Sequence, residues 1–462
     1  MSKIKFGTDG WRAVVGEEFN DENVARVVKA IGQYIYSHFG VRKPVLIGYD
    51  PRNLAPEFAK YASELFSAYG IKVFLSDKIV PTPVIAFSAK KMNSNAVMFT
   101  ASHNPPEYLG IKFIPDYGGP ATNEITQEIV YNTDENIEPF GEAVPVNLIS
   151  FEEEYIAHLE KIIDFKRIEE ANLYVNYDGH HGAAALVVKT IMNKYHIKNT
   201  SLNLIRDVNF GGFMPDPKEK YLPDLKKLCQ ENHSIGLSND GDGDRFGVFN
   251  EKGEFVSANE IIAILLLHLV KNKGYTGKLA KTVGASSMLD LIAKKTGVDV
   301  ILTPVGFKWL GEAMRNEDVI IAGEESGGLS IKGHIPEKDG ILADYLILEA
   351  MAYSGKKLFE LQDELKNILG TEFYSDRLDF SFSSNEEQQK VLDKFLNLKE
   401  FSGKTITDRN FIDGAKYIFD DGSWILVRKS GTEPLLRIYF EAQDKDTLKL
   451  LEEGVKKFVE MR

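Results

Sequence analysis

Hydrophobic and polar positions along the first 350 or so residues alternate between short apolar runs and amphipathic stretches. The short runs are rich in valine, isoleucine and phenylalanine, which is typical of strands, and the longer stretches repeat apolar residues at helical spacing. The first series predicts strands at 44–50, 71–77 and 95–100, with helices at 56–70 and 84–92 between them. This βαβα order favours an α/β sheet with crossover helices.

Two further series have the same alternating order. The second predicts strands at 172–178 and 234–240 with a helix at 184–195. The third predicts helices at 259–274 and 287–297 and strands at 278–283, 298–304 and 319–325. Each series ends in a turn rich in glycine or acidic residues, so we predict three similar α/β units.

The pattern changes after about residue 370, where strands are predicted at 374–382 and within 424–442 and helices at 386–397 and 446–461. These elements indicate a smaller α+β domain. A chain of 462 residues is too long for one core. We therefore predict four domains, at 1–140, 141–250, 251–370 and 371–462.

Composition describes a globular protein of the cytoplasm. The chain is 43% hydrophobic and 27% charged, and its first 25 residues carry charges and glycines rather than a signal peptide. The most apolar run, 261–270, is interrupted by His268 and is too short to span a bilayer, so we expect a buried helix and no membrane contact. A single cysteine, Cys229, excludes an internal disulfide and a cysteine metal cluster.

Net charge restricts the class of partner. The formal charge of −13 argues against nucleic acid as the main partner. If the substrate is an anion, positive side chains must be concentrated locally, because the field of the whole molecule repels it.

One candidate reactive group follows the strand at 95–100. Ser102 and His103 stand directly after that strand, and Pro105 and Pro106 prevent the strand from continuing. Serine, asparagine and proline also favour ordinary turns, so a plain turn is the alternative to a nucleophile presented at a strand end.

A candidate metal site follows the strand at 234–240. Asp240, Asp242 and Asp244 alternate with glycines, and three carboxylates so close together repel one another unless a hard cation neutralises them. An EF-hand calcium loop would place Glu251 at its twelfth position, but Arg245 stands where that loop needs glycine and the flanks look like strands. A solvated acidic turn is the other alternative. The pattern favours a divalent catalytic metal.

Two later loops offer polar groups to a sugar phosphate. In GEESGG, Glu324 and Ser326 suit contacts with sugar hydroxyls, although a polar turn could look the same. The second loop, between two predicted strands, combines guanidinium groups, hydroxyls and a main-chain amide, which are the parts of a phosphate nest or else of a plain hairpin. Its members are Arg428, Ser430, Gly431, Thr432 and Arg437.

Taken in order, these four stretches resemble the α-D-phosphohexomutases. The similarity runs from FGTDGWR at 6–12 to the phosphate loop at 428–437, and TASHNP and DGDGDR are its most distinctive parts. The resemblance implies four domains around a central cleft, the first three of related α/β design with mixed sheets. It also implies that Ser102 carries a phosphoryl group.

The resemblance implies an intramolecular phosphotransferase acting on hexose phosphates. Phospho-Ser102 would give its phosphoryl group to the free hydroxyl, form a hexose 1,6-bisphosphate and take back the other phosphate. One Mg²⁺ per active site would bind to the three aspartates and the Ser102 phosphoryl group, and glucose 1,6-bisphosphate would be the activator. We expect a monomer or a homodimer.

Further site residues are implied by the same resemblance. Candidates for proton transfer are His103, Arg12, Lys112 and Lys338. Arg245 would orient the phosphoserine, and Lys308 and His334 would contact substrate or be structural.

The sugar loop favours glucose. It reads GEESGG with EKDG downstream, as in phosphoglucomutases, whereas the glucosamine branch typically has GEQSGH and the mannose/glucose branch GEMSGH. Gly328 therefore replaces a histidine of those branches. A phosphomannomutase or dual-specificity mutase is the alternative, ahead of a phosphoglucosamine mutase. The alternative of a different class is a non-catalytic sugar-phosphate sensor or a calcium-binding module.

Overall fold

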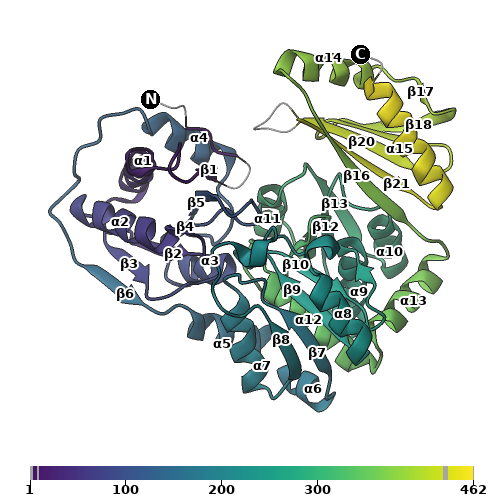
Figure 1. The fold of residues 1–462 in the computed structure, drawn as a ribbon, viewed down its shortest axis with the longest axis horizontal. Helices are drawn as coiled ribbons and strands as arrows, with labels where there is room; N and C mark the ends of the chain where they lie inside the picture. The colour runs from purple at the N-terminus through teal and green to yellow at the C-terminus, as the bar shows by residue number, and fades with distance from the viewer. Residues whose placement is uncertain (1–3, 8–9, 430–434, 461–462) are drawn as a thin grey trace.

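A computed structural model describes residues 4–7, 10–429 and 435–460 of the chain. Four β-sheets, each with its own helices, follow one another along the chain, and the ribbon in Figure 1 runs through them from purple to yellow. The first three are α/β units with mixed sheets, as the family resemblance implies, and the fourth is the predicted smaller α+β domain, with an antiparallel sheet. No helix among these residues has the length and apolar character needed to cross a membrane.

The first sheet has the order β1-β5-β4-β2-β3-β6. Strands β2, β3, β4 and β6 run parallel, while β5 pairs antiparallel with β4 and β1 antiparallel with β5. Its elements are β1 (Trp11–Val14), α1 (Asp21–Phe39), β2 (Val45–Tyr49), α2 (Ala55–Ala68), β3 (Val73–Ser76), α3 (Thr82–Lys91), β4 (Asn95–Phe99), β5 (Tyr108–Ile114), α4 (Asn123–Asn132) and β6 (Val146–Ile149).

Both faces of this sheet are buried, which explains why its central strands read as continuous apolar runs. Val97 and Phe99 of β4 belong to the apolar cluster that includes residues of α1 and α2. Ala96 and Met98, which point to the opposite face, belong to the cluster that includes residues of α3. Strand β4 therefore lies in the middle of a rigid layer, and its carboxyl end delivers Ser102.

The second and third sheets have the orders β11-β10-β9-β7-β8 and β13-β12-β14-β15. In each, an antiparallel hairpin extends a parallel core: β9 turns back into β10, and β14 into β15. The elements of the second unit are α5 (Glu152–Ile162), α6 (Phe165–Glu170), β7 (Tyr174–Asp178), α7 (Ala185–Lys194), β8 (Lys198–Leu202), α8 (Pro223–Asn232), β9 (Ile235–Asn239), β10 (Phe246–Phe249) and β11 (Phe255–Val256). Those of the third are α9 (Ala258–Lys271), β12 (Lys278–Thr282), α10 (Met288–Thr296), β13 (Asp299–Thr303), α11 (Phe307–Asn316), β14 (Val319–Glu324), β15 (Gly328–Ile331), α12 (Gly340–Ser354) and α13 (Leu358–Leu369).

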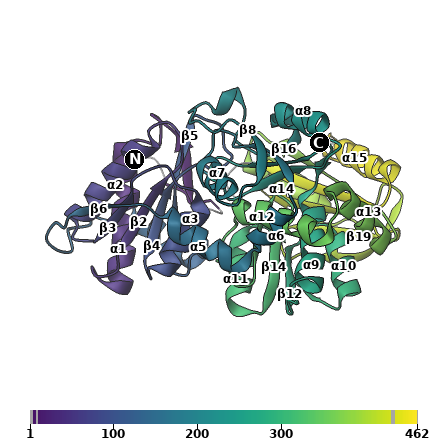
Figure 2. The same ribbon diagram turned by 90° about the horizontal axis from the view of Figure 1, so that it is seen from below.

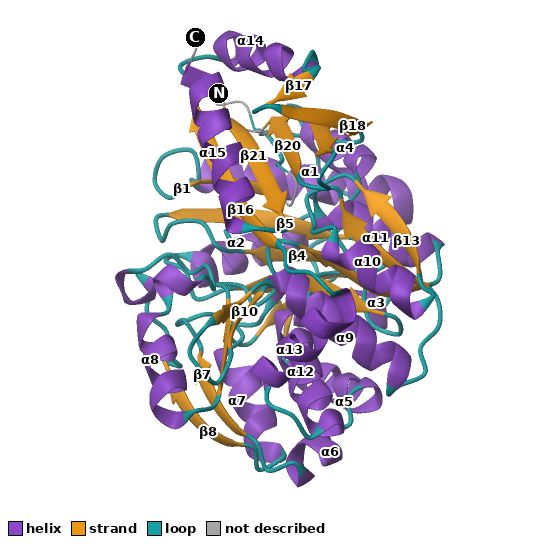
Figure 3. Cartoon of the chain, turned by 90° about the vertical axis from the view of Figure 1, so that its right-hand side faces the viewer, coloured by secondary structure: helices purple, strands orange, loops and turns teal. Residues whose placement is uncertain are grey.

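The fourth sheet has the order β16-β21-β20-β19-β18-β17, and α14 and α15 pack against it (Figure 3). Strands β20 and β21 pair antiparallel and place Arg428 opposite Arg437. Its elements are β16 (Tyr374–Ser381), α14 (Asn385–Leu396), β17 (Glu400–Phe401), β18 (Lys404–Asn410), β19 (Ala415–Phe419), β20 (Trp424–Lys429), β21 (Leu435–Ala442) and α15 (Lys445–Glu460).

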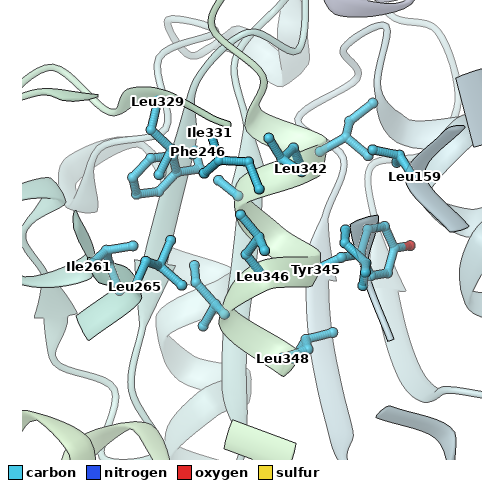
Figure 4. Close-up of a cluster of buried hydrophobic side chains, with 14 of the residues drawn as sticks. Leu159, Phe246, Ile261, Leu265, Leu329, Ile331, Leu342, Tyr345, Leu346 and Leu348 are labelled. Atoms are coloured by element: carbon cyan, nitrogen blue, oxygen red, sulfur yellow. The ribbon is translucent and has the colours of Figure 1, made fainter. Parts of the chain in front are cut away.

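The largest apolar core joins the first three units. Helix α12 is buried almost all round and contacts α6 and α9, and its leucines lie among residues of several elements (Figure 4). Helix α5 packs against α3 of the first unit, as the view from below shows (Figure 2). The apolar run 261–270 lies within α9 and is buried, as its composition predicts. Because the three units share a core, loops from different sheets are held at fixed distances.

Candidate active site

Ser102 lies just beyond the carboxyl end of β4, almost completely buried. Its φ of 51° is in the left-handed region, which is uncommon for a residue with a side chain. Its amide donates to Thr100 Oγ1 at 2.8 Å, and its own Oγ donates to Asp240 Oδ2 at 2.8 Å. The turn at the end of β4 therefore aims a hydroxyl from the first unit at an acidic loop of the second.

His103 lies beside this hydroxyl, with Nδ1 3.2 Å from Ser102 Oγ. Burial, together with the positive charges of Arg245 and Arg12, holds the pKa of His103 well below its ordinary value. The imidazole is therefore neutral at physiological pH, and the lowered pKa also makes it a weaker base. Arg12 on β1 donates from Nη1 to Asn104 Oδ1 at 2.7 Å, so it supports the same turn.

The three aspartates form a compact cluster in the loop between β9 and β10. One ligand oxygen from each of Asp240, Asp242 and Asp244 lies within 4.8 Å of the others, and all three side chains are fully buried. Among the described residues, Oδ1 of Asp242 and Oδ1 of Asp244 have no hydrogen-bond partner. Buried carboxylate oxygens without partners are costly, so the residues present fit a hard divalent cation.

The EF-hand alternative is wrong. The acidic loop joins two antiparallel strands, β9 and β10, where an EF-hand requires two helices. Glu251 is also occupied elsewhere, because its carboxylate accepts the amides of Leu358 and Phe359 at 2.9 and 3.2 Å, at the start of α13.

Two lysines from other units neutralise the cluster. Lys112 on β5 donates to Asp242 Oδ2 at 2.9 Å and to Asp244 Oδ2 at 2.8 Å. Lys338, just before α12, places its Nζ 3.3 Å from Asp244 Oδ2. Burial alone would raise the pKa of Asp242, but the charge of Lys112 and the hydrogen bonds from Lys112 and Thr82 together outweigh it, and the pKa is lowered. The pKa of Asp240 is raised by burial and by the other two carboxylates. A bound cation would favour its ionised form.

The predicted sugar loop lies between β14 and β15. Glu324 ends β14, is nearly buried, and accepts from Ser326 Oγ at 2.7 Å. Burial raises the pKa of Glu324, with Lys338 opposing the shift. A Cβ atom on Gly328 would lie 2.5 Å from Cδ of Lys338. The glycine thus makes room for Lys338.

The predicted phosphate loop is described only at its two strands, since Ser430, Gly431 and Thr432 lie outside the described residues. Arg428 donates from both Nε and Nη2 to Asp413 Oδ2 at 2.7 Å, and the same oxygen accepts the amide of Val305 at 3.0 Å. Nε of Arg437 is buried and finds no hydrogen-bond partner in the described parts of the chain. The two arginines face each other across the β20–β21 pair.

Comparisons with known proteins agree with this geometry. Models of the phosphoglucomutase/phosphomannomutase family match in order: α/β/α domain I at 3–139, domain II at 153–253, domain III at 257–368 and the C-terminal domain at 383–457. A phosphoglucomutase/phosphomannomutase of Thermococcus kodakarensis is 31% identical over 471 residues, which cover 99% of this chain and all of that protein. The chain belongs to this family.

Other similar proteins of this phosphohexomutase family differ in the sugar that their names give. A phosphoglucosamine mutase of Methanocaldococcus jannaschii is 30% identical over 82% of this chain and 83% of that protein. A crystal structure of a candidate phosphomannomutase from Thermus thermophilus has a TM-score of 0.89 at 31% identity, covering 99% of both chains. Membership therefore establishes a mutase and leaves the hexose open.

Within this phosphohexomutase site, the contacts above link His103, Lys112, Lys338 and the three aspartates to Ser102 or its carboxylate partners. Lys308 instead donates to Asn123 Oδ1 at 2.6 Å and so joins α11 to α4 of the first unit. His334 is buried: its Nε2 is 2.8 Å from Asp339 Oδ2 and its Nδ1 is 3.0 Å from His158 Nε2. Both ring nitrogens are therefore engaged by protein groups, and a substrate contact gains no support.

The sequence patterns did not identify several residues that hold the site residues in position. Thr82, at the start of α3, donates to Asp242 Oδ2 at 2.6 Å, and Asp413 holds Arg428. Asp50 and Arg52, in the motif YDPR, pack beneath the Ser102 turn. The available signal was a pair of charged residues directly after the strand at 44–50, a position typical of sites in α/β sheets.

Proposed function

We propose that this mutase interconverts glucose 1-phosphate and glucose 6-phosphate through a phosphorylated Ser102. The observation that carries the proposal is the position of Ser102 Oγ, 2.8 Å from Asp240, in a turn whose neighbours supply both a neutral imidazole and lysine ammonium groups. Phosphoryl transfer depends mainly on alignment and charge stabilisation, and these groups supply both.

In the first half-reaction, the bond between phosphorus and Ser102 Oγ breaks while a sugar hydroxyl forms a new bond to phosphorus. The electron pair of the broken bond stays on Oγ, and the hydroxyl proton passes to a nearby base. The candidates are the neutral imidazole of His103 and the side chains of Arg12, Lys112 and Lys338, which can accept a proton only when uncharged. The reverse sequence, with the other phosphate, regenerates phospho-Ser102.

The three aspartates would hold one Mg²⁺, which when bound withdraws negative charge from the transferring phosphoryl group. Lys112 holds two of those carboxylates in place. Arg428 and Arg437 are proposed to anchor the phosphate that does not react, and Glu324 with Ser326 to contact the sugar hydroxyls. One anchor serves both half-reactions, because turning the bisphosphate over exchanges its two phosphates.

The preference for glucose rests on the sugar loop. Gly328 leaves space that the Lys338 side chain fills, whereas the branches named for glucosamine and mannose typically carry histidine at that position. The test is a mutase assay with glucose, mannose and glucosamine phosphates under the same conditions with the matching bisphosphate. The highest kcat/KM is expected for glucose 1-phosphate. A higher value for mannose or glucosamine would reassign the sugar but not the reaction.

A further inference from the structure

A buried arginine beneath the serine turn takes no direct part in the proposed transfer. Arg52 follows β2 and is fully buried. Its Nη2 donates to the carbonyl oxygens of Ser102 and Asn104 at 2.7 and 2.6 Å, and its Nη1 to those of Pro105 and Tyr108 at 2.7 and 2.9 Å. One guanidinium therefore holds four carbonyls of the turn that carries the reactive hydroxyl.

The other end of the same turn is held by Asp50, which lies two positions before Arg52 in the chain. Asp50 Oδ2 accepts the hydroxyl of Thr100 at 2.6 Å, and Thr100 Oγ1 in turn accepts the amide of Ser102 at 2.8 Å. Nε of Arg52 lies 3.3 Å from Asp50 Oδ2. The amide and the carbonyl of Ser102 are thus both fixed. A left-handed residue with a side chain persists only where its surroundings impose it, and these contacts do so.

A guanidinium suits this position in a way that an ammonium group does not. It is planar and carries five donors in a fixed fork. Here the donors on Nη1 and Nη2 bond four carbonyls, and Nε lies near the Asp50 carboxylate without a hydrogen bond among the described residues. The ring of Phe210, from the second unit, lies 5.1 Å from Cζ of Arg52. Arg206 of the same unit donates to the carbonyl oxygens of Pro51 and Arg52 at 2.9 and 3.1 Å. The support of the serine turn is therefore continuous with the unit that holds the aspartates.

We propose that Arg52 is a positioning residue for phosphoryl transfer. It fixes the main chain of Ser102 so that Oγ faces Asp240 whether or not the serine carries a phosphoryl group. This inference rests on the proposed role of Ser102. Because Arg52 does not touch the sugar phosphate, its loss should slow the transfer step and leave substrate affinity nearly unchanged.

The test compares Arg52→Lys and Arg52→Met with the unaltered protein. Two quantities are measured: kcat and KM for glucose 1-phosphate, and the rate at which dephosphorylated protein gains a phosphoryl group from glucose 1,6-bisphosphate, followed by intact mass. A misplaced reacting group lowers rates by about a hundredfold, so kcat and the loading rate of Arg52→Met should both fall by about that factor. KM should stay within about twofold. Arg52→Lys should lie between, since an ammonium group can reach only some of the carbonyls.

Arg26→Met is the matched control, because it removes an arginine of the same unit that bonds the carbonyl of Thr133 and the carboxylate of Asp134, outside the serine turn and its support. It should retain kcat within about threefold, which is far from the factor of a hundred expected for a misplaced reacting group. If folded Arg52→Lys and Arg52→Met keep full kcat, or raise KM without lowering kcat, the positioning role is rejected. If Arg52→Met does not fold, Arg52→Lys alone decides. If the unaltered protein takes up no phosphoryl group, the proposed function itself fails, which is a distinct result.

Discussion

Positive side chains lie close to the Ser102 hydroxyl that we propose as the phosphoryl carrier. A serine hydroxyl is a weak nucleophile and a poor leaving group unless neighbours stabilise the charge that develops on its oxygen. Lys112 and Lys338 lie at the cluster of carboxylates that Ser102 Oγ contacts, and Arg245 follows that cluster in the chain. The pKa of Arg245 is raised, because the carboxylates Asp216 and Asp240 outweigh the effect of burial. It therefore stays charged.

The Asp50 carboxyl beneath the turn gives a test of stability against pH. Burial raises the pKa of Asp50 from 3.8 to about 6, despite the charge of Arg52 and the hydrogen bond from Thr100. Such a group stabilises the folded state fully below its unfolded pKa and loses that contribution as pH rises through its folded pKa. The amide side chain in Asp50→Asn does not titrate, so this variant lacks the pH-dependent contribution of the carboxyl group. Its stability relative to the unaltered protein should therefore increase by about 2 kcal/mol between about pH 4 and about pH 7.5.

The measurement is the denaturant midpoint of both proteins at the two pH values. Parallel behaviour of the two proteins across this window would show that the Asp50 pKa is not raised.

The assignment of the metal to the three aspartates can be tested with two substitutions. Asp242→Asn removes a charge from the cluster and should weaken Mg²⁺ binding by about tenfold or more and lower kcat. Glu251→Gln changes the residue that an EF-hand would need, but here that carboxylate caps α13, so Mg²⁺ affinity should be unchanged. Calorimetric titration of the purified proteins with Mg²⁺ measures both affinities, and chelator should abolish activity of the unaltered protein. Weaker Mg²⁺ binding by Glu251→Gln than by Asp242→Asn would contradict the assignment of the metal to the three aspartates.

At the scale of elements, the start of β15 controls the space for Lys338. A Cβ atom on Gly328 would lie 2.5 Å from Cδ and 2.7 Å from Cγ of that lysine, so the lysine must move. Gly328→Ala should lower kcat for glucose 1-phosphate by about tenfold, as expected when a proton-transfer group is misplaced. Steady-state kinetics measure the effect. Gly141→Ala is the control, since its Cβ would meet only one atom, at 3.9 Å. Full activity of Gly328→Ala would remove Lys338 from the reaction.

The β20–β21 pair and the loop after β14 should have separable effects. Arg428→Ala removes a charge-assisted contact of roughly 1.5–3 kcal/mol and should raise KM by about ten- to a hundredfold. Glu324→Ala should instead change the ratio of glucose to mannose activity. Kinetic constants for both sugar phosphates measure the two effects. Lys429→Ala is the matched control, because this exposed neighbour of Arg428 bonds Gln389. If Arg428→Ala changed the ratio of glucose to mannose activity and Glu324→Ala only raised KM, the two sites would be assigned the wrong way round.

Sequence patterns predicted the elements well where local signals were strong. The strands at 44–50 and 95–100 and the helix at 184–195 correspond to β2, β4 and α7 within a few residues. Helix α1 and the strands β1 and β5 were not predicted. The pairing of β1 with β5, which sets Trp11 opposite Ile111, depends on contacts between distant segments, which a local pattern does not contain.

The site residues could be predicted only where a local sequence pattern marks them. Ser102 and the three aspartates could be identified because residue types suited to chemistry or metal binding stand directly after a predicted strand. Arg52 and Thr82 act through contacts with residues that are 50 and 160 positions away in the chain, so no spacing rule identifies them. His334 shows the converse: its residue type suggests chemistry, but the fold buries it in a hydrogen-bonded network.

At the scale of the whole molecule, an acidic chain gathers positive side chains at the sites that we propose for the sugar phosphate. The formal charge is −13, yet lysines of the first and third units meet the aspartates of the second, and two arginines face each other in the fourth. The shared core of the first three units holds the reacting groups together, which suits a reaction governed by alignment.

The most direct test of the phosphoserine claim follows the phosphoryl group itself. The purified protein is loaded from glucose 1,6-bisphosphate labelled with radioactive phosphorus, freed of excess label, and then mixed with unlabelled glucose 1-phosphate. The label should add about 80 Da to the intact protein, the mass of one phosphoryl group. It should map to Ser102 and appear in the sugar phosphates within one turnover. Ser102→Ala should take up none. Equal labelling and equal turnover of Ser102→Ala and the unaltered protein would contradict the phosphoserine mechanism.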